Sequence, residues 1–394
     1  MTSLAQKYLK MVPQYTRNSR HARAVMQHGT PRKWINLARV EWERKKRRVE
    51  VKGNPYLLII DPTNFCNLRC PLCPTGVKSL GREQSMMSLE CFKHYFDPHV
   101  PYLFEVYLHN WGESLLNKQT YDMIEYAQSK NVGTNLSSNL SALDDEDLDR
   151  LIDSGLEYLV VSLDGASEET YKKYRVRGKF DRVMRNMREL IKRRNARGLV
   201  HPVVEWQFIV MRHNEHEVEE AERISEEYGV DIMRFIPVGL PYDFADRKKL
   251  QEEWFPTNMQ GRVEDAKHDE QTFGQGHKPG ACFYLYRSMV VNSDGGVSPC
   301  CVVYQKDRDF AQLTTDSEND VNAIFNNESY KSARSLFSPQ KVNGRCKTVC
   351  DGCDIFAVHP SKMDDVPEEP DEPDTSGDKP AEKIPHIAAS RRTA

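Results

Sequence analysis

The sequence lacks any long apolar run. Across 394 residues, no apolar stretch approaches the roughly 20 residues that a helix needs to cross a bilayer. The N-terminus lacks the apolar core of a secretion signal, and no internal repeat is present. The ten cysteines are clustered rather than scattered, which favours metal ligation in a reducing cytoplasm over a disulfide framework. We therefore expect a globular protein without a spanning helix.

Charge is unevenly distributed along the chain. The net charge is −3, but residues 1–50 carry 13 Lys or Arg against 3 Glu. A basic arm of this kind can bind nucleic acid or an anionic membrane. Aromatic residues are not interleaved with the bases in any repeated way, so the pattern favours a solvated amphipathic helix that leads into the next domain.

A regular alternation of strands and helices begins near residue 55. Short apolar runs predict six strands, each followed by a helical pattern, at residues 56–60, 104–108, 133–136, 158–162, 203–210 and 232–236. Six β-then-α units imply a parallel sheet with helical crossovers, and they are too few for an eight-fold barrel. The chain divides into a basic helical extension (1–52), an α/β core (53–240), a polar linker with a helix (241–278), a cysteine-rich region (279–358) and an acidic, proline-rich tail (359–394) that cannot bury a core.

Three cysteines crowd the loop after the first strand. Cys66, Cys70 and Cys73 have the spacing Cys-x3-Cys-x2-Cys, and thiolates are ligands that zinc and iron–sulfur clusters prefer. Structural zinc needs four ligands, and the next cysteine, Cys91, falls in an expected helix. A trio with one open corner suits a four-iron cluster, and a zinc knuckle is the alternative.

This loop resembles that of the radical SAM superfamily, which is defined by the same spacing after the first barrel strand. Asn67-Leu68-Arg69, between the first two cysteines, is also similar. The resemblance implies a partial (β/α)6 TIM-like barrel. Chemistry in parallel barrels lies at the carboxyl ends of the strands, where this loop falls.

The ends of the next strands carry further motifs similar to this family. Trp111-Gly112-Glu113-Ser114 matches two of four positions of a Gly-Gly-Glu-Pro motif whose residues hold the amino group of S-adenosylmethionine. Ser162-Leu163-Asp164-Gly165 resembles a motif of the branch with a C-terminal cluster domain. The resemblance implies that the cofactor contacts are Gly112, Glu113, Ser138, Asn139, Ser162, Asp164 and either Arg175 or Arg177, with Arg177 preferred. Simple capping is the alternative for the polar strand ends.

Six further cysteines form a second set near the C-terminus, around a hairpin expected at Asp294-Gly295-Gly296. The pattern resembles the SPASM and twitch domains that follow many radical SAM barrels. It implies one auxiliary four-iron cluster on Cys282, Cys300, Cys350 and Cys353, with Cys346 as a replacement ligand and Cys301 as spare. A zinc ribbon is the alternative.

Together these features predict an enzyme that cleaves S-adenosylmethionine reductively and abstracts hydrogen from a substrate C–H bond. A one-electron donor such as flavodoxin or ferredoxin is implied. The missing peptide-binding domain before residue 55 favours oxidation of a small molecule such as a sugar, cyclitol or alcohol. A peptide maturase, an epimerase and a zinc-bound nucleic-acid scaffold are the alternatives. Substrate-side candidates are Gln207, Arg234 and the thiol of Cys301.

Overall fold

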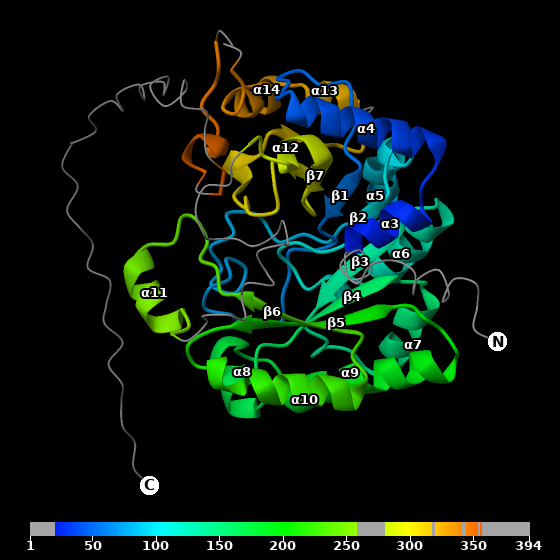
Figure 1. The fold of residues 1–394 in the computed structure, drawn as a ribbon, viewed down its shortest axis with the longest axis vertical. Coiled ribbons are helices and arrows are strands. Elements are labelled where there is room, and N and C mark those ends of the chain that lie inside the picture. The colour runs from blue at the N-terminus through cyan, green and yellow to red at the C-terminus, as the bar shows by residue number, and fades with distance from the viewer. Residues whose placement is uncertain (1–19, 258–279, 317–319, 340–343, 354, 357–394) are drawn as a thin grey trace.

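A nine-stranded sheet forms the centre of the protein (Figure 1). The computed structural model describes residues 20–257, 280–316, 320–339, 344–353 and 355–356. The strand order is β6-β5-β4-β3-β2-β1-β7-β8-β9. All neighbouring pairs from β6 to β7 are parallel, whereas β8 is antiparallel to both β7 and β9. The six parallel strands and their crossover helices confirm the expected partial (β/α)6 barrel.

Each expected strand is present within a residue or two of its expected bounds. The barrel strands are β1 (Leu57–Ile60), β2 (Glu105–Tyr107), β3 (Gly133–Ser138), β4 (Tyr158–Ser162), β5 (Val203–Val210) and β6 (Ile232–Pro237). The crossover helices are α5 (Leu89–Phe96), α6 (Thr120–Ser129), α7 (Asp145–Asp153), α8 (Glu168–Tyr174), α9 (Phe180–Ala196) and α10 (Val218–Tyr228). Short 3-10 turns lie at η1 (Asp97–His99), η2 (Ser114–Leu116) and η3 (Glu215–Glu217).

Local chemistry accounts for where the crossover helices begin and end. The Ser88 side chain caps α5 by accepting from the Cys91 amide, and Gly229 ends α10 in the left-handed region with φ 71°. Helix α8 was not expected from the sequence. Its signal was present, because Ser167 caps it and two glutamates occupy its first turn.

The two faces of the barrel strands differ in character. Residues that point outward, toward the helices, are fully buried and apolar, and they include Leu58, Val106, Leu159, Trp206 and Phe208. The inward residues of β5 alternate with these and include the polar Glu205 and Gln207. The polar side chains of the sheet are therefore gathered inside the barrel.

Two N-terminal helices cover the end of the barrel where the strands begin. In α3 (Arg20–Gln27), His21 Nδ1 lies 2.6 Å from Glu105 Oε1 at the start of β2. Helix α4 (Pro31–Lys45) begins at the Thr30 cap, and Trp34 packs edge-on against Phe104. Within the part of the chain that the structure describes, no helix is long and apolar enough to span a bilayer.

The C-terminal region extends the barrel sheet instead of standing apart from it. The expected hairpin forms between β7 (Ser288–Val291) and β8 (Gly296–Ser298), and β7 pairs in parallel with β1, which the sequence did not predict. Gly295 has φ 82° in the turn. The remaining elements are α11 (Arg247–Trp254), α12 (Tyr284–Arg287), β9 (Ala311–Gln312), α13 (Val321–Phe325), α14 (Glu328–Ser335), η5 (Lys306–Arg308) and η6 (Val349–Gly352).

Candidate active site

Cys66, Cys70 and Cys73 share one partly buried loop at the carboxyl end of β1. Burial, with smaller contributions from Glu113, Cys70 and Cys73, raises the pKa of Cys66 to about 12. The Leu68 amide donates to Cys66 Sγ at 3.4 Å, and the Cys73 amide donates to the Cys70 carbonyl. Crowded thiols of this kind can ionise together only beside a compensating cation, so the donor set fits a cluster.

The Trp111–Ser114 loop is fastened onto this cysteine loop. The Glu113 amide donates to the Phe65 carbonyl at 2.7 Å, and Thr75 Oγ1 donates to the Trp111 carbonyl at 2.8 Å. A Cβ on Gly112 would lie 1.7 Å from the Thr63 carbonyl oxygen, so only glycine fits. Trp111, which departs from the family motif, packs edge-on against Tyr304 of the C-terminal region with ring centroids 5.0 Å apart.

The Glu113 carboxylate is buried beside the three thiols. It accepts from Ser138 Oγ and from the Asn139 amide, both at 2.8 Å, so β3 and the β2 loop are joined at this point. Burial raises the pKa of Glu113 against the opposing effect of these hydrogen bonds. Arg175 is near enough to lower the pKa of Glu113 but forms no salt bridge with it in the described part of the chain, so the ammonium of a bound ligand could pair with this carboxylate.

Asp164 lies fully buried at the end of β4 and holds an arginine. Its Oδ2 accepts from Arg175 Nε at 2.5 Å, and its Oδ1 accepts from the Ile209 amide at 2.8 Å. Arg175 also lies close enough to Cys70 to lower the pKa of that thiol, although burial raises it overall to about 11. Arg177 is exposed, with φ 71°. The structure therefore brings Arg175, and not Arg177, to the cysteine loop.

Three polar side chains form a row on the inner face near the barrel mouth. Ser162, Gln207 and Arg234 are register partners on β4, β5 and β6, and each is partly buried. The buried Glu205 lies one layer below, and its Oε1 is 3.0 Å from Arg234 Nε. The position of Arg234 is thus fixed by an ion pair inside the barrel.

Four thiols of the C-terminal region lie close together. Burial, with contributions from nearby thiols, raises the pKa of Cys282 to about 12 and that of Cys300 and Cys350 well above the ordinary value. Cys353 contributes to all three shifts and Cys301 to those of Cys282 and Cys300, so Cys282, Cys300, Cys350 and Cys353 stay the predicted ligand set. In the part of the chain described, no three His, Cys, Asp or Glu side chains converge tightly enough for one metal ion. The four thiols supply an all-sulfur donor set, which an iron–sulfur cluster or a structural zinc ion can take.

The other two C-terminal cysteines each have a side-chain partner outside this set, although Cys301 is near enough to Cys300 and Cys282 to raise their pKa values. The Cys346 thiol is 3.2 Å from Ser332 Oγ, its hydrogen-bond partner on α14. Cys301 packs against the inward-facing cluster of Ile59, Tyr107 and Val290, and its thiol lies 3.6 Å from the Tyr284 hydroxyl. Cys301 therefore borders the barrel interior, and Cys346 does not.

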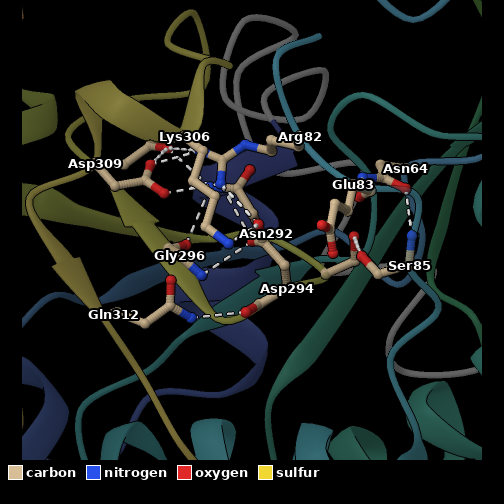
Figure 2. A network of polar contacts seen from close by, with 12 residues as sticks. Asn64, Arg82, Glu83, Ser85, Asn292, Asp294, Gly296, Lys306, Asp309 and Gln312 are labelled. Atoms are coloured by element: carbon tan, nitrogen blue, oxygen red, sulfur yellow. Dashed lines mark hydrogen bonds and ion pairs between the residues drawn. The ribbon is translucent and has the colours of Figure 1, made fainter.

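Arg82, which sequence reasoning missed, joins the cysteine loop to the C-terminal hairpin (Figure 2). Its guanidinium contacts Asp309 at 2.5 and 2.8 Å and Asp294 at 3.2 Å, and its Nε donates to the Tyr304 carbonyl at 2.6 Å. The adjoining Ser85 bonds to Ser293 at 2.7 Å. The Arg82 side chain is 1% exposed, and no local sequence signal marked it.

Asp61, at the end of β1, gives a testable pH dependence. Burial raises the pKa of Asp61 to about 7, although the Trp111 amide donates to its Oδ2 at 3.1 Å. The folded state then keeps this proton between pH 4 and 7 while the unfolded chain loses it, so the stability contribution falls as pH rises through that window. Asp61→Asn should remove this slope, which is at most about 1.4 kcal/mol per pH unit.

The measurement for Asp61 is anaerobic urea unfolding of both proteins from pH 5.5 to 8. The stability of Asp61→Asn relative to wild type should improve up to about pH 7 and then level off. Asp145→Asn is the control, because Arg185 lowers the pKa of that exposed carboxyl and its removal should not flatten the slope. Parallel pH profiles for wild type and Asp61→Asn would contradict the prediction.

Comparison with known proteins agrees with this site. The family description "Radical SAM superfamily" matches residues 60–223, and "Iron-sulfur cluster-binding domain", of the SPASM type, matches residues 282–354. Fe-coproporphyrin III synthase of Methanosarcina barkeri is 30% identical over 136 residues, which is 34% of each chain. PqqA peptide cyclase of Bradyrhizobium diazoefficiens is 25% identical over 127 residues, 32% of this chain and 33% of the cyclase. The chain thus spans about a third of these relatives.

Solved structures share the fold. Streptococcus suis SuiB bound to S-adenosylmethionine superposes with a TM-score of 0.54 at 15% identity, covering 85% of this chain and 79% of SuiB. SuiB bound to its precursor peptide SuiA gives 0.53 at 15% identity, covering 76% and 71%. The two family matches imply [4Fe-4S] clusters and S-adenosylmethionine as the cofactors. The chain thus carries a radical SAM domain over residues 60–223 and a SPASM-type iron–sulfur cluster-binding domain over residues 282–354.

Proposed function

We propose that this protein is an oxidoreductase that removes hydrogen from a C–H bond of a small polar substrate in the barrel mouth. The observation that carries the proposal is the sorting of the cysteines into a three-thiol and a four-thiol set around one polar barrel interior. When bound, the clusters and S-adenosylmethionine supply one-electron reduction and a 5′-deoxyadenosyl radical, with electrons from a donor such as flavodoxin or ferredoxin.

The residues of the chain would bind and orient the cosubstrate. Cys66, Cys70 and Cys73 would hold the first cluster and leave one iron for S-adenosylmethionine. Glu113, fixed by Ser138 and Asn139, would accept the ammonium of the methionine moiety. Arg175, oriented by Asp164, would pair with its carboxylate, and Ser162 lies within the same mouth. Fixed partners of this kind lower the entropy cost of reaching the reactive geometry.

The polar row at the mouth supports a small polar substrate. Gln207 can both donate and accept hydrogen bonds, and Arg234 can pair with a hydroxyl or a carboxylate. Cys282, Cys300, Cys350 and Cys353 would hold the auxiliary cluster, which would supply electron-transfer chemistry for the oxidation.

Two other outcomes have observations in their favour. Cys301 borders the barrel interior, and its thiol could return a hydrogen atom to the substrate radical, which gives a redox-neutral epimerisation. Deuterium from D2O would then appear at the reacting carbon, and Cys301→Ala would abolish its incorporation. A peptide substrate is favoured by the shared fold with SuiB and by the partial likeness to PqqA peptide cyclase.

The test is anaerobic reconstitution followed by reduction with S-adenosylmethionine. Wild type should hold about eight irons, four per cluster, and release 5′-deoxyadenosine. Cys353→Ala should fall to about four irons. Cys346→Ala, the matched control, should keep about eight because its thiol bonds to Ser332. Zinc without absorbance near about 400 nm would refute the proposal, and loss of four irons in Cys346→Ala alone would refute the ligand assignment.

A further inference from the structure

Helix α4 turns its polar side chains toward the protein. Lys33 Nζ donates to the Asn131 carbonyl at 2.6 Å, and Asn36 exchanges two hydrogen bonds with the Asn54 backbone, both at 2.9 Å. The Glu43 carboxylate accepts from the amides of residues 52 and 53. All three side chains belong to buried residues, and each has a partner. Val40 is buried as well, but the other buried residues of α4 are polar, whereas an ordinary surface helix buries an apolar face.

The opposite side of α4 is apolar and exposed. Trp34 is 45% exposed, Ile35 64% and Trp42 51%, and Ala38 is also exposed. Trp34, Ala38 and Trp42 follow each other at intervals of four residues, so they lie on one helix face with Ile35 beside them. We call these four residues the outer face of α4. Contiguous exposed apolar side chains of this size usually mark an interaction site.

Basic residues border the outer face. Arg32, Arg39, Lys45, Lys46 and Arg48 are exposed, and the Arg48 guanidinium lies 5.3 Å from the centre of the Trp42 ring. The two acidic residues of this helix are turned inward, because Glu41 pairs with Arg287 at 2.6 Å and Glu43 binds backbone amides. The exposed charge around the outer face is therefore positive.

We infer that the outer face of α4 binds peripherally to an anionic phospholipid membrane. Tryptophan and isoleucine would enter the interface between headgroups and acyl chains, and the arginines and lysines would contact phosphate groups. A nucleic acid is a less suitable partner, because its polar sugar–phosphate backbone would offer Ile35 and Ala38 no apolar surface to pack against. A second copy of the chain is also disfavoured, because a two-fold axis through this face would place the same arginines and lysines of both copies close together, where they repel.

The position of α4 is compatible with catalysis at the mouth. It contacts Asn54, Phe104 and Arg287, which precede β1, β2 and β7, so it lies at the end of the barrel opposite the cysteine loop. Figure 1 shows α4 along the margin of the molecule, at a distance from the loops beyond the carboxyl ends of the strands. Membrane binding through α4 would leave the mouth open to substrate and electron donor. The inference does not depend on the proposed function.

The test uses the full-length holoprotein and vesicles of phosphatidylcholine alone or mixed with phosphatidylglycerol. The protein should sediment with the mixed vesicles and not with pure phosphatidylcholine, and added salt should weaken binding. Two double variants should each lower the affinity at least tenfold: Ile35→Ser with Trp42→Ala, and Lys45→Glu with Lys46→Glu. Tryptophan emission of the wild type should shift to shorter wavelength on binding.

The matched control is Lys248→Glu with Lys249→Glu on α11, which changes net charge equally at exposed positions away from α4. It should bind within about twofold of wild type, and all variants should keep 5′-deoxyadenosine formation. Three results would overturn the inference. They are no binding to the mixed vesicles, an equal loss in the α11 control, or a dimer without lipid that Ile35→Ser with Trp42→Ala dissociates.

Discussion

Arg82→Met should destabilise the protein by about 3–5 kcal/mol, because it leaves the buried Asp309 carboxylate without its cation and leaves Asp294 with the more distant Lys306, 3.9 Å away. The side chains of Asp309 and Asp294 are 8% and 12% exposed, so water can restore little of the lost interaction. Burial alone would lower the pKa of Arg82, but these two partners outweigh it and raise the pKa. A loss of this size is a large part of the 5–15 kcal/mol that holds most domains folded.

The structural effect of Arg82→Met should be greatest where the cysteine loop meets the β7–β8 hairpin. Arg82 ties residues near Thr63 and Asn64 to β8 and the Cys300–Tyr304 segment, so the distance between the two thiol sets depends on it. We expect Arg82→Met still to cleave S-adenosylmethionine but to form less product for each molecule cleaved. Arg82→Lys, which keeps the charge but not the planar fork, should fall between the two proteins.

Urea unfolding and the ratio of product to 5′-deoxyadenosine measure the two effects. Arg223→Met is the matched control, since Arg223 pairs with Glu220 and Glu227 on the exposed surface of α10 and should change stability by less than about 1 kcal/mol. Arg82→Met with Asp309→Leu should recover part of the loss, because the uncompensated charge is then removed. A change in Arg82→Met no larger than in the control would contradict this role.

The sequence predicted what local patterns encode. The six strands have the periodicity and turn residues that specify them, and the three-cysteine loop falls at a strand end that topology places at the mouth. The four auxiliary thiols followed from spacing and from resemblance. The strands and the three-cysteine loop depend on residues that lie near one another along the chain, so sequence reasoning could reach them, whereas the auxiliary ligand set stays a prediction.

Contacts between distant segments could not be predicted in this way. Arg82 meets Asp309 across 227 positions, and nothing in Gly81-Arg82-Glu83 indicates burial. Arg175 and Arg177 are two residues apart, and only the backbone turn, with φ 71° at Arg177, decides which one reaches Asp164. The cysteine spacing alone does not distinguish Cys346 from Cys350 as a cluster ligand. The structure adds that the Cys346 thiol has a hydrogen-bond partner, Ser332. The parallel pairing of β7 with β1 also joins segments that are distant in the sequence, so local patterns do not predict it.

Gly112→Ala should abolish S-adenosylmethionine cleavage while leaving the barrel folded. The added Cβ would lie 1.7 Å from the Thr63 carbonyl oxygen and 3.0 Å from that of Phe65, and both are backbone atoms that cannot rotate away. The two loops must then separate by more than about 1 Å. Since Glu113 is the next residue, its carboxylate would leave the position set by Ser138 and Asn139, and misplacement by about 1 Å costs on the order of 100-fold in rate.

Anaerobic assay of 5′-deoxyadenosine formation and iron content tests this prediction. Gly198→Ala is the control, because Gly198 has φ 67° and nothing within 4 Å of an added Cβ, so it carries only the conformational cost of about 1 kcal/mol. Its activity should equal that of wild type. Gly112→Ala should keep its auxiliary cluster, whose ligands lie in the C-terminal region, because the clash is confined to the β1 and β2 loops. Normal cleavage in Gly112→Ala would mean that the two loops can separate without moving Glu113, and that the tight backbone contact at Gly112 is not what positions the carboxylate.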